Sequence, residues 1–85
     1  MKLKSTFITH MSGNEQLMIS AGGDFNGMVR SNSTAAEIID MLKNEITREA
    51  IIAAMLEKYE VEEAVLSADV DKVIDKLRSI GAIDE

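Results

Sequence analysis

The side chains that could carry out chemistry in this sequence are few and poorly placed for it. His10 is the only histidine and the chain has no cysteine, so neither a sulfur-ligated metal site nor a thiolate nucleophile is available. Glu62 with Glu63 and Asp69 with Asp71 offer paired carboxylates, but acid–base catalysis also needs a pocket, which a chain of 85 residues is poorly able to form. We therefore expect no catalytic residue, no metal and no cofactor.

One stretch offers a different chemistry, that of unpaired main-chain groups. Residues 27–31, GMVRS, have the pattern of a short strand that passes directly into a helix start. An edge strand in a small sheet exposes N–H and C=O groups, and natural proteins usually protect such edges with charge, twist or a covering element. This strand carries only one charge, on Arg30. The sequence thus predicts an edge left open.

The preceding residues predict the strands beside this edge. Residues 5–11 and 16–21 are apolar runs, the first of them rich in β-branched and aromatic side chains. The Gly-Asn pair within residues 12–15 predicts a tight turn, so the two runs should form a hairpin. Residues 22–27 hold three glycines and are expected to be a loop.

The first two helices are predicted from capping residues and apolar periodicity. Asn32, Ser33 and Thr34 supply N-cap chemistry, and Thr34 stands at capping-box spacing from Glu37, so the first helix should begin near Ser33. Thr47 is expected to cap the second helix.

The third helix follows the same reasoning. Ser67 is expected to cap it, with residues 60–66 as a candidate extra turn before it, and Gly81 is a natural stop. Three strands followed by three helices predict one α+β domain over residues 1–85, a winged-helix-like fold in which helices cover one face of a three-stranded antiparallel sheet.

Composition narrows the function further. Hydrophobic residues make up 46% and charged residues 28%, which is typical of a folded soluble domain. The net charge of −6 repels polyphosphate and argues against nucleic acid as a partner. No apolar run approaches the length of a membrane span and the N-terminus lacks the apolar core of a signal peptide. The expected location is the cytoplasm.

Three segments resemble a known family when taken together. The junction MVRSNSTAAEII, the following ITREAIIAAMLEKYEV and the end ADVDKVIDKLRSIGAI are similar in order and spacing to the PqqD-like domains, named for coenzyme PQQ synthesis protein D. The resemblance covers about residues 24–83. Its firmest points are the Asn-x-Thr-Ala-Ala junction, Tyr59 and the ADV that opens the last segment.

The resemblance implies a non-catalytic peptide-binding module. PqqD-like domains are recognition elements in the biosynthesis of ribosomally made, post-translationally modified peptides, often beside a radical SAM maturase. They hold the leader segment of a precursor peptide so that the enzyme can modify the core segment. In this family the leader adds as a strand to the third strand and lies against the third helix. Those elements correspond here to residues 27–31 and 69–80.

The predicted peptide-binding residues come from these two elements, and several have an expected role. Gly27 would allow close approach of a second backbone, Arg30 would pair with an acidic leader residue, and Val73 and Ile80 would floor the groove. Met28 and Val29 must point to opposite faces, and the sequence leaves open which faces the core. The full set is Gly27, Met28, Val29, Arg30 and Ser31 on the strand, with Asp69, Lys72, Val73, Lys76, Leu77 and Ile80 on the helix.

Two other functions stay open at this point. A winged-helix nucleic-acid binder or transcriptional regulator would need basic residues along an exposed third helix, whereas SADVDKVIDKLRS has three acidic and three basic residues. A structural domain could instead use the open edge to form a homodimer by sheet pairing. We expect a monomer.

Overall fold

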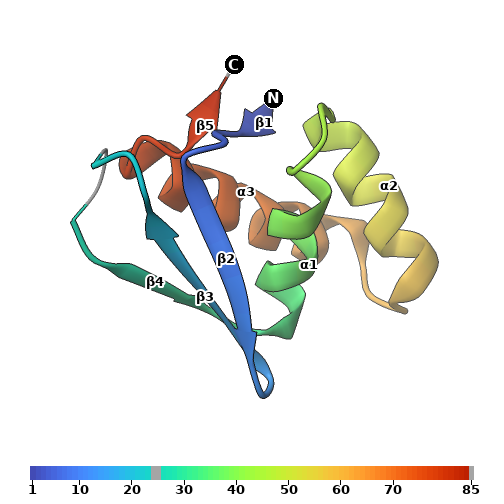
Figure 1. Cartoon of the computed structure of the whole chain (residues 1–85). Coiled ribbons are helices and arrows are strands. Elements are labelled where there is room, and N and C mark those ends of the chain that lie inside the picture. Colours follow the sequence, from blue (N-terminus) through green and yellow to red (C-terminus); the bar gives the residue numbers. More distant parts are fainter. Residues whose placement is uncertain (24–25, 85) are drawn as a thin grey trace.

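The computed structural model describes residues 1–23 and 26–84, and it confirms the predicted α+β fold class. Three strands form an antiparallel sheet in the order β2-β3-β4, comprising β2 (Phe7–Ser12), β3 (Glu15–Ser20) and β4 (Met28–Ser31). Three helices follow along the chain, α1 (Ser33–Met41), α2 (Arg48–Lys58) and α3 (Glu63–Ser79). The helices gather on one side of the sheet (Figure 1), which leaves the other side uncovered.

The core lies between the inner face of the sheet and the three helices. Phe7 and Met18 point inward from the strands and are almost fully buried. Each helix contributes an apolar stripe, and the stripe of α3 repeats at helical spacing. The buried helix residues in this core are Ile38, Ile39, Ile51, Ile52, Met55, Leu66, Val70, Ile74 and Leu77.

The hairpin between β2 and β3 forms as predicted. Ser12 faces Glu15 across the ladder, which leaves a two-residue turn of Gly13 and Asn14. Gly13 has a φ of 64°, a conformation that glycine adopts without steric cost and that two-residue hairpin turns require. Of the predicted loop at residues 22–27, positions 24 and 25 lie outside the described residues.

Helix α1 begins at Ser33 as predicted, and Asn32, one of the three residues predicted to supply N-cap chemistry, caps it. The side chain of Asn32 accepts a hydrogen bond from the backbone N–H of Ala35 at 2.9 Å. The predicted capping box of Thr34 and Glu37 is therefore wrong. Glu37 instead reaches across to the end of α2, where its carboxylate accepts a bond from the Tyr59 hydroxyl at 2.6 Å.

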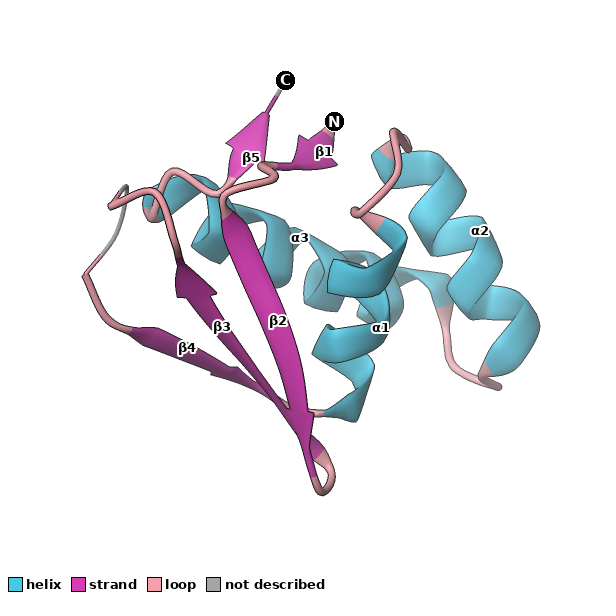
Figure 2. Ribbon diagram, viewed as in Figure 1, coloured by secondary structure: helices cyan, strands magenta, loops and turns pink. Residues whose placement is uncertain are grey.

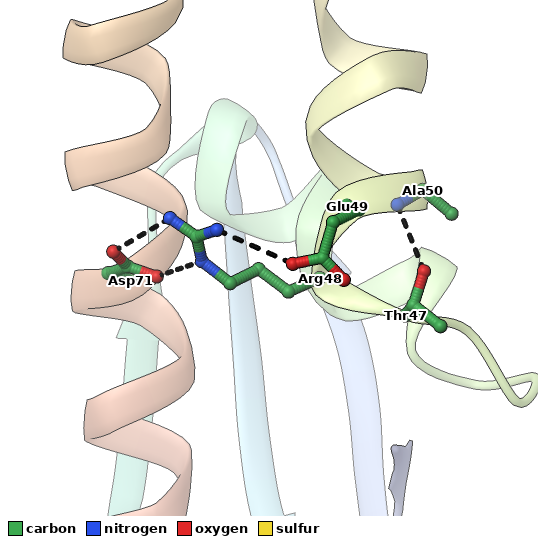
Figure 3. Close-up of polar contacts among 5 residues, drawn as sticks. All are labelled: Thr47, Arg48, Glu49, Ala50 and Asp71. Atoms are coloured by element: carbon green, nitrogen blue, oxygen red, sulfur yellow. Dashed lines mark hydrogen bonds and ion pairs between the residues drawn. The ribbon is translucent and has the colours of Figure 1, made fainter.

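Thr47 caps α2 as predicted, accepting a bond from the N–H of Ala50 at 3.1 Å (Figure 3). The predicted cap of the third helix at Ser67 is wrong, because α3 begins at Glu63 and Ser67 lies inside it. The candidate extra turn before Ser67 is thus helical from residue 63. The helix begins this early because Leu66, which is 3% exposed, extends the apolar stripe of α3 one turn toward the N-terminus.

Gly81 ends α3 as predicted. It has a φ of 73°, and its N–H donates to the carbonyl of Arg78 at 3.0 Å. The next N–H, from Ala82, donates to the carbonyl of Leu77 at 2.8 Å. These two bonds form a Schellman motif, which satisfies the last carbonyls of the helix.

One element was not predicted from the sequence, a two-stranded pairing of the terminal segments. β1 (Lys2–Leu3) pairs antiparallel with β5 (Ile83–Asp84), so the N-terminal and C-terminal segments lie side by side, as Figure 2 shows. A two-residue strand is too short to show alternation of apolar and polar side chains. Leu3 is 4% exposed and anchors this pair to the core.

Candidate functional site

The alternation of hydrogen bonds along the central strand, β3, determines which main-chain groups of β4 remain free. One step beyond the β2–β3 ladder, the N–H of Ala21 donates to the carbonyl of Thr6 at 2.7 Å. Bonded pairs alternate with non-bonded pairs in an antiparallel ladder, so the odd-numbered residues of β3 bond to β2. The even-numbered residues Gln16 and Met18 therefore direct their N–H and C=O groups toward β4.

The same alternation of hydrogen bonds continues in β4. Ser31 and Val29 face Gln16 and Met18 in the register and bond to β3. The two intervening residues, Met28 and Arg30, point their N–H and C=O groups away from the sheet. No described residue hydrogen-bonds to those outward groups outside the ladders. The edge predicted to be open is open, and its free groups belong to these two residues.

A groove of about 250 Å³ runs beside this edge. Its floor is apolar, since Ile39 and Leu77 are each 1% exposed and Val29 and Val73 are half-buried against the core. The residues that line it come from β4, α1 and α3, namely Val29, Arg30, Ser31, Asn32, Ala35, Ile39, Lys72, Val73, Lys76 and Leu77. An extended chain laid along β4 would thus have main-chain partners on one side and an apolar surface on the other.

Two further hollows adjoin the groove at the end near the helix start. One extends past Asn32 to Ser12 and Asn14 at the hairpin turn. The other follows α3 toward its N-terminus and is lined by Asp69 and Lys72. Because both share Asn32 with the main groove, the three adjoin one another at the start of α1.

The rim of the groove is positively charged although the chain as a whole carries −6. Arg30, Lys72 and Lys76 are all exposed at this rim. The guanidinium of Arg30 lies 3.9 Å from the carboxylate of Glu15, and neither lysine forms an ion pair with any residue in the described ranges. The groove therefore favours an acidic or electrically neutral occupant.

Polar contacts on the far side of α3 hold this wall of the groove in place. The guanidinium of Arg48 in α2 donates two hydrogen bonds to the carboxylate of Asp71 in α3, at 2.5 and 3.1 Å (Figure 3). These bonds hold the pKa of the Asp71 carboxyl below its ordinary value and raise that of Arg48. Asp71 is therefore a structural partner of Arg48.

A second polar contact joins α1 to the end of α2. The hydrogen bond from the Tyr59 hydroxyl lowers the pKa of the Glu37 carboxyl and raises that of the tyrosine. Lys58 adds a hydrogen bond to the same carboxylate at 3.2 Å. Tyr59 is one of the residues that carry the family resemblance. Its hydrogen bond thus connects α1, which lines the groove, with the end of α2.

The structure brings most of the predicted site residues to one place. Seven of the eleven line the main groove, namely Val29, Arg30, Ser31, Lys72, Val73, Lys76 and Leu77. Asp69 lines the adjoining hollow. Met28 contributes free main-chain groups, but its side chain lies on the uncovered face, which answers which of Met28 and Val29 points inward.

The remaining two predicted residues lie elsewhere. Gly27 directly precedes β4 and has a φ of 144°, so it shapes the entry to the strand. Ile80 does not line the groove. It caps the C-terminus of α3, is 9% exposed and packs in the core.

The contribution of α1 to the groove was not predicted. Ala35 and Ile39 line the groove and Asn32 joins its hollows. Ile39 belongs to the core as well as to the groove floor. Ile39 has both roles because α1 lies close to β4. Without that approach it would simply be buried.

The histidine and the glutamate pair that were considered for other chemistries do not line the groove. His10 is exposed on the uncovered face of the sheet, and the described residues contain no cluster of His, Cys, Asp and Glu that could hold a metal ion. Glu62 and Glu63 are exposed where α3 begins. Among the described helices, none is long and apolar enough to cross a membrane.

Comparisons with known proteins agree with this geometry. Residues 15–83 match the model of the family described as coenzyme PQQ synthesis protein D (PqqD). No curated protein matches the sequence at a significant level.

Two solved structures share the fold of the chain. One, described as TbiB1 in complex with the TbiA(beta) leader peptide, aligns with a TM-score of 0.80 over 99% of this chain and 100% of that chain, at 16% sequence identity. The other, lasso peptide synthetase B1 complexed with the leader peptide, aligns with a TM-score of 0.77 over 95% of this chain and 93% of that chain, at 17% identity. Similarity at this level of identity establishes the fold.

Proposed function

Because the chain belongs to the coenzyme PQQ synthesis protein D family, we propose that it binds the leader segment of a ribosomally made precursor peptide. The leader adds as a fourth strand to β4 and lies in the groove against α3. One observation carries this proposal, namely that the outward N–H and C=O groups of Met28 and Arg30 border an apolar groove. Main-chain bonds supply affinity in strand addition, and side-chain pockets beside the strand supply specificity.

The proposal has further parts that go beyond the groove. The chain presents the bound leader to a separate modifying enzyme, such as a radical SAM maturase, and has no catalytic role of its own. It acts as a monomer in the cytoplasm. The two similar solved structures, both of which contain a leader peptide, support the peptide as the occupant of this site.

Amide hydrogen exchange measured by NMR tests the binding mode. In the free protein, the amides of Val29 and Ser31 should be protected by β3, whereas those of Met28 and Arg30 should exchange rapidly. A leader peptide encoded beside this gene should protect Met28 and Arg30 on titration. Rapid exchange of both amides in a saturated complex would exclude strand addition at β4.

The same experiment separates leader binding from the homodimer alternative. If β4 paired with a second copy of itself, Met28 and Arg30 would become protected without peptide as protein concentration rises. Light scattering across the same concentrations would then report a doubled mass. Our proposal expects a constant monomer mass and no such protection.

A turnover assay tests the role as a presenting module. The partner enzyme should modify the full precursor faster in the presence of this chain, and the chain alone should leave the precursor unmodified. A core peptide lacking its leader is the control, because it should gain nothing from the added chain. Equal turnover of the full precursor with and without the chain would remove the presenting role.

A further inference from the structure

The uncovered face of the sheet carries an apolar row that reaches the open edge. Ile8, Ile19 and Met28 occupy successive strands and face one another in register. They are 51%, 47% and 48% exposed, among the most exposed large apolar side chains of the described residues. We call these three residues the outer row. It ends at β4, beside the free main-chain groups of Met28.

A second line of side chains crosses the same face next to the outer row. His10, Leu17 and Arg30 face one another in register. The Arg30 side chain is 68% exposed and stands at the open edge. The edge therefore presents two neighbouring features on this face, an apolar end at Met28 and a cation at Arg30.

A strand added to β4 necessarily places side chains on both faces of the sheet. Residues directly opposite each other in an antiparallel pair project to the same face, and successive residues alternate between faces. Peptide residues opposite Val29 and Ser31 would therefore enter the groove. Those opposite Met28 and Arg30 would lie on the uncovered face, next to the outer row and the guanidinium.

We infer that this chain reads its peptide on both faces of the sheet, and that the peptide carries an acidic residue opposite Arg30 and an apolar residue opposite Met28. This inference rests on the proposed function. The two outward residues are separated by one groove-facing residue, opposite Val29, which is apolar because its surroundings are apolar. In an antiparallel complex the order from the peptide N-terminus is a groove residue opposite Ser31, then acidic, apolar and apolar.

Physical chemistry favours this arrangement over recognition by the groove alone. An apolar residue opposite Met28 would lengthen the outer row by one strand and remove apolar surface from water. An acidic residue opposite Arg30 would form a cross-strand ion pair, a type of contact that stabilises sheets. Lys72 and Lys76 stand across the groove on α3, so they reinforce the preference for an acidic peptide from the other side.

Selection from a random linear peptide library displayed on phage tests the inference without knowledge of the natural leader. The parent protein should enrich peptides with an apolar groove-facing residue between an acidic and an apolar outward residue. We expect each outward preference to be roughly two- to fivefold over the library, as the strength of single cross-strand pairs implies.

Two variants assign the preferences to their residues. Arg30→Glu should convert the acidic preference into a basic one while the groove-facing apolar residue persists. Met28→Lys should remove the outward apolar preference alone. The control is His10→Glu, which adds an acid to the same face and the same line of side chains but at the opposite edge strand, and it should leave the selected pattern unchanged. Circular dichroism should confirm that all three variants remain folded.

The outcomes separate the inference from the proposed function. Enrichment at the groove-facing position with random outward positions would overturn two-face reading and leave leader binding at β4 intact. Selected peptides that bind an Arg30→Pro variant as tightly as the parent would show that β4 is not the site, and both proposals would fail. A library that yields no binder would also count against both.

Discussion

The two edges of the sheet differ in what accompanies their free main-chain groups. The outward groups at β4 belong to Met28 and Arg30 and border an apolar groove walled by α3. At β2 the outward residues are Phe7, Thr9 and Met11, by the same alternation. The N–H of Phe7 is already taken by the Lys4 carbonyl at 3.0 Å.

The surroundings of the β2 edge also differ in kind. Lys2, Lys4 and Lys43 line a hollow beside the N-terminal half of β2. The lining of that hollow comes from β1, β2, the residues between them and Lys43, so no helix supplies an apolar wall to it. A free edge is therefore not a binding site by itself. We propose that it becomes one where a helix supplies an apolar wall beside the free groups, as α3 does at β4.

Proline substitution should break this comparison most strongly. Arg30→Pro removes an outward N–H of β4 and places a ring where the peptide backbone would lie, so leader binding should fall more than tenfold. Thr9→Pro makes the same change at β2 and should leave binding unchanged. Both should stay folded, since edge strands accept proline where the N–H faces outward. Titration calorimetry and thermal melts would report both quantities.

A third proline variant provides the control on β4 itself. The N–H of Val29 bonds to β3, so Val29→Pro should lower the free energy of unfolding by about 1–3 kcal/mol by leaving a ladder partner unsatisfied. Stability losses in the reverse order, with Arg30→Pro the more damaging, would show that the bonding phase of β4 has been assigned wrongly.

A charge on the groove floor should have the next largest effect. Val73 is half-buried in the groove, and Val73→Asp should weaken leader binding by about 1–3 kcal/mol if the complex desolvates the new carboxylate. Val65→Asp is the matched control, because Val65 lies on the same helix but is 53% exposed and lines no part of the groove. Equal calorimetric affinities for the two variants would move the binding site away from α3.

Reversing the charge of a single lysine should produce a smaller difference in leader binding between the two edges. Lys76→Glu at the groove rim should weaken binding of an acidic leader by roughly two- to fivefold at low salt, as expected for exposed charge pairs. Lys4→Glu, beside β2, changes the net charge equally and should have little effect. The difference should shrink as ionic strength rises. A difference that does not respond to salt would mean that Lys76 acts through packing.

The smallest effect should come from the hydrogen bond between Tyr59 and Glu37, which holds α1 in place. Helix α1 lines the groove beside β4 but not the hollow beside β2. Tyr59 lowers the folded-state pKa of Glu37 below its ordinary 4.5. The contact therefore contributes stability above that pH, and this contribution is lost as pH falls through the lowered pKa. Tyr59→Phe should lower the free energy of unfolding slightly at neutral pH and flatten the acid limb of the stability profile. An unchanged acid limb in urea melts would contradict this role for Glu37.

Sequence patterns predicted the elements well where local physics decides them. The Gly-Asn turn, the Thr47 cap and the Gly81 stop each follow from nearby residues, and all three are confirmed. The family resemblance is confirmed by the match over residues 15–83. The same local reasoning failed at Ser67, where burial of Leu66 outweighed a good capping residue.

The parts of the site that were missed depend on how elements approach one another. The hydrogen-bonding pattern of β4 follows from the hairpin register, so strand periodicity alone does not decide whether the N–H of Val29 or that of Arg30 points outward. Ile80 was placed in the groove from the helical period, but the end of α3 turns it into the core. The groove lining from α1 needed the distance between a helix and a strand, which no single segment encodes.

The alternation along β4 also restricts the register in which a peptide can pair with this edge. A strand that slips by one residue turns every side chain to the wrong face, whereas a slip by two restores both the main-chain bonds and the facing. A peptide held here can therefore shift only in steps of about 6.8 Å, the length of two residues in a strand. With only Met28 and Arg30 offering free groups, few such steps keep any bonds at all. In the proposed function, this register would fix the distance along the precursor between the bound segment and the residue that the enzyme modifies.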